Sequence, residues 1–237
     1  MDHNKALIIP YGERFMHVSI EYGARKRLSL TVYPHGEILA KVPLGVPVRK
    51  AESFIRKRAA WMDKHLRHFE QHPPEPPKRY MEDELHPFLG KHYRLRLRRS
   101  PSSSVRREKG HLEVALRDPG DPAAVEKVLR KWYREEALRY MKPRFRELSS
   151  SLSFLGLPAH SLRFYRMKRR WGSCSARGVI TLNTQLVQQT PASIDYVIIH
   201  ELCHLRVPAH NREFYALLES VLPDWKTRRR ELNEKSY

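Results

Sequence analysis

The stretch His200-Glu201-Leu202-Cys203-His204 decides the fold of this 237-residue chain, and His210 follows it closely. Two histidines four residues apart on a helix lie about 40° apart around the helix axis and about 6 Å along it. Both imidazoles can therefore converge on one Zn²⁺ ion, while Glu201 can act as general base on a water molecule at that ion. The spacing predicts a helix that carries a catalytic zinc site.

The residues before this stretch predict that it is helical and packed into a core. Thr190 has the character of an N-cap, and Pro191 fits the first helical position, where its missing N–H is not needed. Apolar residues at helical spacing form one stripe: Ile194, Val197, Ile198, Leu202 and Leu205. Pro208 ends the helix, because proline cannot continue the hydrogen-bond ladder.

His210 is expected on the turn after this helix, where it can serve as the third ligand. Three protein ligands leave one tetrahedral position for water, which is typical of a catalytic rather than a structural zinc site. Glu219, on the next expected helix, is an alternative third ligand, because other zinc hydrolases use a downstream carboxylate. The competing interpretation is an ordinary amphipathic helix whose histidines are surface or core residues.

Composition limits the class of protein. A chain of 237 residues can bury a core and form one elaborated domain or two small ones. No run of about 18 apolar residues is present, and residues 1–7 lack the basic-then-apolar plan of a secretory signal. Cys174 and Cys203 form no metal-type pair, which fits a reduced compartment. We therefore expect a cytoplasmic enzyme with no membrane partner.

The chain is strongly basic, with 45 Lys and Arg against 26 Asp and Glu and a net charge of +19. Such a charge attracts polyanions, so nucleic acid bound through the basic surface and nucleotides are candidate partners. The basic runs fall in separate regions: 25–27, 56–58, 94–99 and 228–230. No nucleic-acid-binding motif accompanies them, so a solvated basic surface is the alternative.

One basic cluster, Lys168-Arg169-Arg170, leads directly into the block Trp171-Gly172-Ser173-Cys174-Ser175. Positive charge beside a zinc site would stabilise the oxyanion of peptide hydrolysis or the phosphate oxygens of a nucleotide. A solvated strand face is the alternative reading of this cluster.

The block itself offers several candidate contacts with a substrate. Trp171 is expected to pack against the zinc helix or to form a wall of the site. Gly172 permits a tight turn or the close approach of a substrate backbone. Ser173 could donate a hydrogen bond to substrate, although turn chemistry alone would also favour serine. The short sheet expected before the zinc helix has an edge strand, which could pair with an extended peptide and lay its scissile bond across the metal.

The hydrophobic pattern divides the chain into a β-rich amino-terminal region with one long helix (1–118) and a zinc-binding catalytic region (119–237). The elements expected in the first region are strands within 15–42, a helix over 47–71, a proline-rich linker over 72–77, and strands within 87–97 and 110–116. Those expected in the second are a helix from 121 to about 148, a loop over 149–153, strands over 162–167 and 179–183, the zinc helix, and helices over 211–221 and after Pro223.

Together these residues resemble the YgjP-like metallopeptidase family, zincin-type proteins similar in their core to SprT-like proteases. The matching positions are 170–175, 180–183, 195–205, His210 and Phe214, with 27–32, Gly36, 43–45, Trp61 and 89–93 in the amino-terminal half. The resemblance implies that His200, His204 and His210 are the metal ligands and that Glu201 is the catalytic glutamate. It leaves the substrate open, since one member is associated with pyrophosphohydrolysis of nucleoside triphosphates.

The sequence therefore predicts an α+β fold with a zincin-like metalloprotease core, a short sheet plus the H-E-x-x-H helix, and an amino-terminal β-rich elaboration. The expected function is zinc-dependent hydrolysis of a peptide or protein. Two alternatives stay open at this point. One is a nucleoside-triphosphate pyrophosphohydrolase that uses the same metal pocket. The other is a basic nucleic-acid-binding protein with a structural zinc site.

Overall fold

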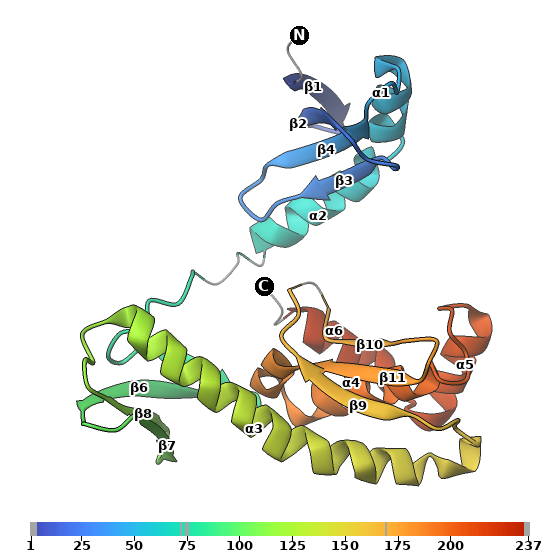
Figure 1. Cartoon of the computed structure of the whole chain (residues 1–237). Helices are drawn as coiled ribbons and strands as arrows, with labels where there is room; N and C mark the ends of the chain where they lie inside the picture. The colour runs from blue at the N-terminus through green and yellow to red at the C-terminus, as the bar shows by residue number, and fades with distance from the viewer. Residues whose placement is uncertain (1–3, 72, 74–75, 169, 235–237) are drawn as a thin grey trace. The chain divides into compact units, whose positions relative to one another are not determined.

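The computed structural model describes residues 4–71, 73, 76–168 and 170–234. The chain separates into two units, Met1–Pro76 and Pro77–Tyr237, and the division falls within the proline-rich linker expected from the sequence. Both units combine strands with helices (Figure 1). The α+β class predicted from the sequence is thus confirmed.

The first unit is built on a four-stranded sheet in the order β1-β2-β4-β3. Its strands are β1 (Asn4–Tyr11), β2 (Arg14–Gly23), β3 (Ser29–Val32) and β4 (Ile38–Pro43). Strands β2 and β4 pair in parallel, and the other neighbours are antiparallel. Alternate residues of β2 are buried, because one face of the sheet packs on the two helices that follow.

Two helices, rather than the single helix expected over 47–71, complete this unit. They are α1 (Val48–Arg56) and α2 (Ala59–Gln71). A tight turn separates them, in which the Arg58 N–H donates to the Ile55 carbonyl at 2.9 Å. The Arg58 guanidinium folds back over the Phe54 ring, 3.7 Å from its centroid. Such a turn leaves the helical period of the apolar residues almost unchanged, so the sequence pattern does not reveal it.

The second unit begins with a four-stranded sheet in the order β5-β6-β8-β7. Its strands are β5 (Leu85–Phe88), β6 (Lys91–Arg99), β7 (Ser104–Glu108) and β8 (His111–Leu116). The sequence pattern does not predict β7, because Val105 is its only apolar residue.

The long helix α3 (Pro122–Ser151) joins this sheet to the rest of the unit (Figure 1). Its N-cap is Asp121, whose side chain accepts the Ala123 N–H at 2.9 Å. Val114 of β8 and Leu129 of α3 belong to one hydrophobic core. Strands β5–β8 bury their apolar residues in the core that α3 provides, so they belong to the same unit as α3. The division into an amino-terminal region, 1–118, and a catalytic region, 119–237, stays a prediction.

The rest of the second unit is a three-stranded sheet with three helices and two short 3₁₀ turns. The strands are β9 (Ser161–Tyr165), β10 (Gly172–Cys174) and β11 (Val179–Asn183), in the order β10-β11-β9. The helices are α4 (Pro191–Cys203), α5 (Arg212–Val221) and α6 (Trp225–Glu234), and the turns are η1 (Ser153–Leu155) and η2 (Thr184–Gln188). Both β10 and β11 contact α4, so the edge strand β10 lies along the helix of the H-E-x-x-H motif.

Two tertiary contacts fix α4 in place. Arg144 of α3 forms a bidentate ion pair with Asp195 of α4, with both N–O distances at 2.7 Å. The β5–β6 turn rests on the start of α4, where a Cβ at Gly90 would lie 2.7 Å from Cγ2 of Thr190. Gly90 also has a φ of 75°, so only glycine fits this close approach without strain.

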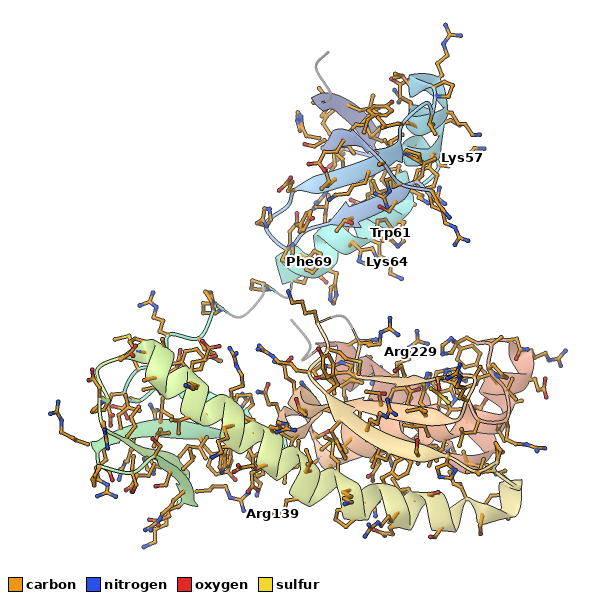
Figure 2. All side chains as sticks on the ribbon, in the orientation of Figure 1. Lys57, Trp61, Lys64, Phe69, Arg139 and Arg229 are labelled. Carbon is orange, nitrogen blue, oxygen red and sulfur yellow. The ribbon has the colours of Figure 1, made fainter. Side chains whose placement is uncertain are left out.

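The basic side chains are distributed over both units. Lys57 and Lys64 project from the first unit, and Arg139 and Arg229 project from the second (Figure 2). The net positive charge therefore does not by itself define a nucleic-acid-binding surface.

Among the described residues, no helix is both long and apolar enough to cross a membrane.

Candidate metal centre and its surroundings

Helix α4 forms as its sequence predicts. The Thr190 hydroxyl caps the helix by accepting the Ser193 N–H at 3.2 Å, and Pro191 occupies the first position. Ile194, Ile198 and Leu202 are fully buried on the face that packs into the core. The regular helix ends at Cys203, so His200 lies in the last turn and His204 is the C-cap residue.

Three histidines meet at this end of α4. The Nε2 atoms of His200, His204 and His210 lie 3.0–3.2 Å from one another. Two nitrogen ligands of one tetrahedral zinc ion, each about 2.0–2.1 Å from it, would be about 3.4 Å apart. The spacing of the three nitrogen atoms therefore fits one metal ion bound by all three imidazoles.

The surroundings hold the three rings in their converging orientation. The His204 Nδ1 lies 3.1 Å from the Val207 carbonyl, which fits an Nδ1–H donor and leaves Nε2 free for a metal. The buried Phe214 ring contacts all three imidazoles, with centroid separations of 4.4–4.9 Å. Phe214 sits at the start of α5, where its N–H donates to the Asn211 side chain at 2.9 Å.

Burial favours the neutral form of the His200 and His204 imidazoles, which is the form that binds metal. It lowers the pKa of His200 to about 3, with further lowering by His204, His210 and Arg229. Burial also lowers the pKa of His204, and the hydrogen bond to Val207 opposes this shift.

The Glu201 side chain lies against Gly172 of strand β10. Its carboxyl is buried, and Oε2 has no hydrogen-bond partner among the described residues. Burial raises the pKa of Glu201 to about 7, and the charge of Arg170 opposes this rise. A carboxyl group with such a pKa can accept and release a proton near neutral pH.

The absence of a side chain at Gly172 leaves the space that the Glu201 carboxyl group occupies. A Cβ at position 172 would lie 2.5 Å from Oε1 and 2.7 Å from Cγ of Glu201. The group that approaches Gly172 closely is thus the Glu201 carboxyl, which the sequence did not indicate, and the approach of a substrate backbone to Gly172 stays a prediction.

Strand β10 leaves one side open, because it pairs only with β11 in the described sheet. The Trp171 carbonyl accepts the Asn183 N–H at 2.8 Å, and in an antiparallel pair every second residue bonds to the partner strand. The backbone N–H and C=O groups of Gly172 and Cys174 consequently face the open edge. These groups are available to an extended chain.

The other candidates in this segment lie in different surroundings. Ser173 is half-buried, and the pleat places its side chain on the opposite face from Gly172 and Cys174. Lys168 and Arg170 are exposed. Arg169 lies outside the described residues.

Asn183 shapes the segment that leads into β10. Its buried side chain donates to the carbonyls of Met167 and Arg170 at 2.8 and 2.9 Å, and accepts the Met167 N–H at 3.3 Å. The sequence pattern predicts Asn183 only as the end of a strand. Its role depends on tertiary contacts that no local pattern indicates.

The alternative third ligand, Glu219, takes no part in the histidine cluster. It is exposed on α5 and forms an ion pair with Lys226 at 3.3 Å. Cys203 is fully buried, and burial raises the pKa of its thiol to about 12. Among the described residues, the three histidines therefore remain the group that could hold a metal ion.

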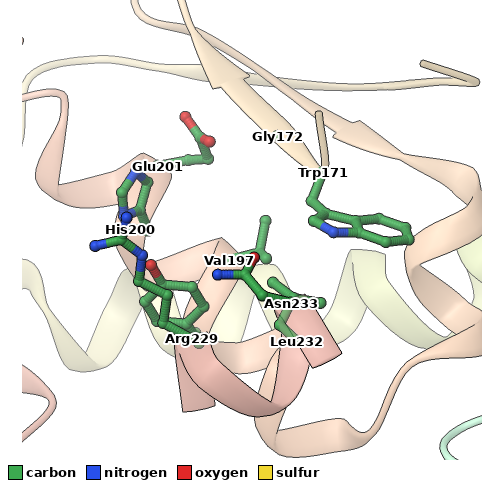
Figure 3. A pocket seen from close by; sticks show the side chains of 9 residues that line it. Trp171, Gly172, Val197, His200, Glu201, Arg229, Leu232 and Asn233 are labelled. Atoms are coloured by element: carbon green, nitrogen blue, oxygen red, sulfur yellow. The ribbon is translucent and has the colours of Figure 1, made fainter. Parts of the chain in front are cut away.

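A cavity of about 200 Å³ opens beside His200 and Glu201 (Figure 3). The residues that line it are Trp171, Gly172, Tyr196, Val197, His200, Glu201, Arg229, Leu232 and Asn233. Arg229, Leu232 and Asn233 come from one face of α6 and were not predicted as site residues. The run 228–230 gives three arginines in a row, and only the packing of α6 decides which of them reaches the cavity.

The sequence profile of a family described as "YgjP-like, metallopeptidase domain" matches residues 26–235. No curated protein sequence matches the chain significantly.

Among solved structures, the metallopeptidase zymogen of Pyrococcus abyssi abylysin is similar at 24% identity, over 38% of this chain and 93% of that chain. The TM-score of that match is 0.34, and a score this low supports no conclusion about the present chain.

Proposed function

The chain belongs to the family of YgjP-like metallopeptidase domains, and from that premise we propose that it is a zinc peptidase in which Glu201 is the general base. The observation that carries the proposal is the pairing of two features. Three histidine Nε2 atoms converge within 3.2 Å, and a buried carboxyl with an unpartnered oxygen lies on the adjacent residue.

His200, His204 and His210 are the residues that would hold the metal. Three imidazoles suit zinc, and three ligands leave room for water or substrate. When bound, zinc would supply Lewis-acid chemistry, making a water molecule more acidic and polarising the scissile carbonyl.

Glu201 moves the proton in the proposed reaction. As water attacks the carbonyl carbon, a C–O bond forms and the Glu201 carboxylate takes the proton from that water. The same carboxyl then gives the proton to the amide nitrogen as the C–N bond breaks. The pKa of about 7 suits both halves of this transfer.

Strand β10 would orient the peptide. An extended chain can add to its open edge through the backbone groups of Gly172 and Cys174. The strand runs between two cavities, the one in Figure 3 beside Gly172 and a second of about 480 Å³ lined in part by Cys174 and His204. A peptide on this edge would therefore pass Glu201 and present side chains to both.

The basic segment 168–170, which leads into β10, would support the same reaction. The charge of Arg170 reaches Glu201, as its effect on the pKa of that carboxyl indicates. We assign Lys168, Arg169 and Arg170 to the approach of the substrate, where positive charge favours a developing oxyanion. Trp171 would form one wall of the adjoining cavity.

A comparison of zinc-loaded wild type with Glu201→Gln tests the proposal on a library of unstructured peptides. The variant should keep its metal and its fold, and its turnover should fall by about 10²-fold or more. Glu219→Gln is the matched control, because it neutralises an exposed carboxylate outside the histidine cluster and should leave turnover unchanged. Near-normal cleavage by Glu201→Gln would refute the role of Glu201. Hydrolysis of nucleoside triphosphates without cleavage of any peptide would replace the peptidase proposal.

A further inference from the structure

We propose that the cavity beside His200 and Glu201 is a subsite for a carboxylate group of the peptide substrate and that Arg229 recognises it. The inference rests on the peptidase function proposed above and names a substrate class for it. It is carried by the position, the charge and the size of the cavity.

The position of the cavity places it next to the reacting bond. Its lining includes His200 of the histidine cluster, the Glu201 carboxyl and Gly172 at the open edge of β10. A peptide paired with that edge has side chains that alternate on either face, and one of them would enter this cavity. The group that enters belongs to a residue close to the scissile bond.

Arg229 supplies the positive charge in the lining of the cavity. Its neighbour Arg228 is satisfied by Asp224 at 2.8 Å, and it also approaches Asp195 at 4.0 Å. Lys226 on the same helix pairs with Glu219 at 3.3 Å. Arg229 has no hydrogen bond or ion pair to any described residue, and its guanidinium group lies beside His200 in Figure 3.

Arg229 lines the cavity, so its positive charge lies within reach of a group that enters it. A planar guanidinium with free N–H groups binds a carboxylate through two parallel hydrogen bonds. Such a group is thus available to a substrate anion.

The size of the cavity favours a single side chain or chain end. About 200 Å³ lies below the range of about 300–1,000 Å³ typical of pockets for whole small-molecule ligands. Trp171, Val197 and Leu232 offer apolar surface for methylene groups, and Asn233 adds a hydrogen-bonding amide. This combination suits the side chain of glutamate or aspartate, or the terminal carboxylate of a peptide.

The test compares zinc-loaded wild type, Arg229→Gln and Arg230→Gln on matched peptides. Each pair of peptides differs only in glutamate against glutamine next to the scissile bond, or in a free against an amidated carboxyl terminus. Arg230→Gln is the matched control, because it removes the same charge from the same helix but does not line the cavity. The two kinds of pair show whether the carboxylate comes from a side chain or from the chain end.

We expect wild type to favour the carboxylate peptide of one kind of pair by about tenfold in kcat/KM, mainly through KM. Arg229→Gln should lose this preference, and Arg230→Gln should keep it. An equal preference for the carboxylate peptide in wild type and Arg229→Gln would overturn the inference. If both proteins still cleaved the peptides in that case, the peptidase proposal would stay intact.

A binding measurement separates the two proposals. Fluorescence anisotropy of labelled peptides on zinc-loaded Glu201→Gln reports affinity without turnover, and the substitution of Arg229 is added to that background. Binding of the acidic peptides that depends on Arg229 would support the subsite even if wild type cleaved none of them. Binding that is tighter for a nucleoside triphosphate than for every acidic peptide would overturn it.

Discussion

Replacing Gly172 with alanine should disable the enzyme without touching a metal ligand. The new Cβ would lie 2.5 Å from Oε1, 2.7 Å from Cγ and 2.9 Å from Cδ of Glu201, whereas ordinary contacts begin at 3.4 Å. The carboxyl group must therefore move by about 1 Å, and a displacement of that size in a catalytic group costs about 10²-fold in rate.

The assay is kcat/KM on the best peptide from the library, measured alongside zinc content and the unfolding temperature. Zinc content should equal that of wild type, because the three histidines are not displaced. Overpacking at one position costs about 1–3 kcal/mol, so the protein should remain folded at assay temperature. Gly23→Ala is the control, because a Cβ there meets nothing within 4 Å.

Retention of at least half of the wild-type kcat/KM by Gly172→Ala would refute the reasoning. It would mean either that the Glu201 carboxyl does not need its observed position or that another group accepts the proton.

Three further predictions concern the metal and the scaffold. His204→Ala should hold far less zinc than wild type by elemental analysis, and a variant that keeps one zinc per chain would remove His204 from the ligand set. Chelation should lower the unfolding temperature of wild type in a scanning calorimeter, because zinc at 100 times its Kd stabilises by about 2.7 kcal/mol; an unchanged temperature would contradict metal binding by the folded state. Arg144→Ala should destabilise the protein by about 2 kcal/mol in a urea titration, because Asp195 loses its bidentate partner and keeps only Arg228 at 4.0 Å. The exposed Arg146→Ala should cost less than about 0.5 kcal/mol, and equal costs for the two variants would refute the structural role of the pair.

Much of the scaffold is predictable because its signals are local. The cap at Thr190, the proline at 191 and the apolar stripe of α4 all lie within a few turns of one another, and the helix forms where they indicate. The same holds for the Asp121 cap of α3, although that helix continues through the loop expected at 149–153 as far as Ser151. Its last turn carries serines, whose weak helix preference is overridden by packing of the helix against the core.

The remainder depends on contacts between distant residues. Nothing near Gly172 in the sequence indicates that Glu201 packs on it, and nothing in 228–230 indicates that Arg229 alone reaches the cavity. The position of the unit boundary was likewise decided by the core that β8 shares with α3. Local patterns identified the residue types that the chemistry needs, while the partners of those residues required the fold.

The central claim is that one metal ion is held by His200, His204 and His210 with a position left for water. X-ray absorption at the zinc edge of the metal-loaded protein tests it most directly. We expect three imidazole nitrogens and one oxygen around the zinc, all at about 2.0–2.1 Å. A sulfur ligand at about 2.3 Å, as Cys174 would supply, or fewer than three imidazoles would contradict it.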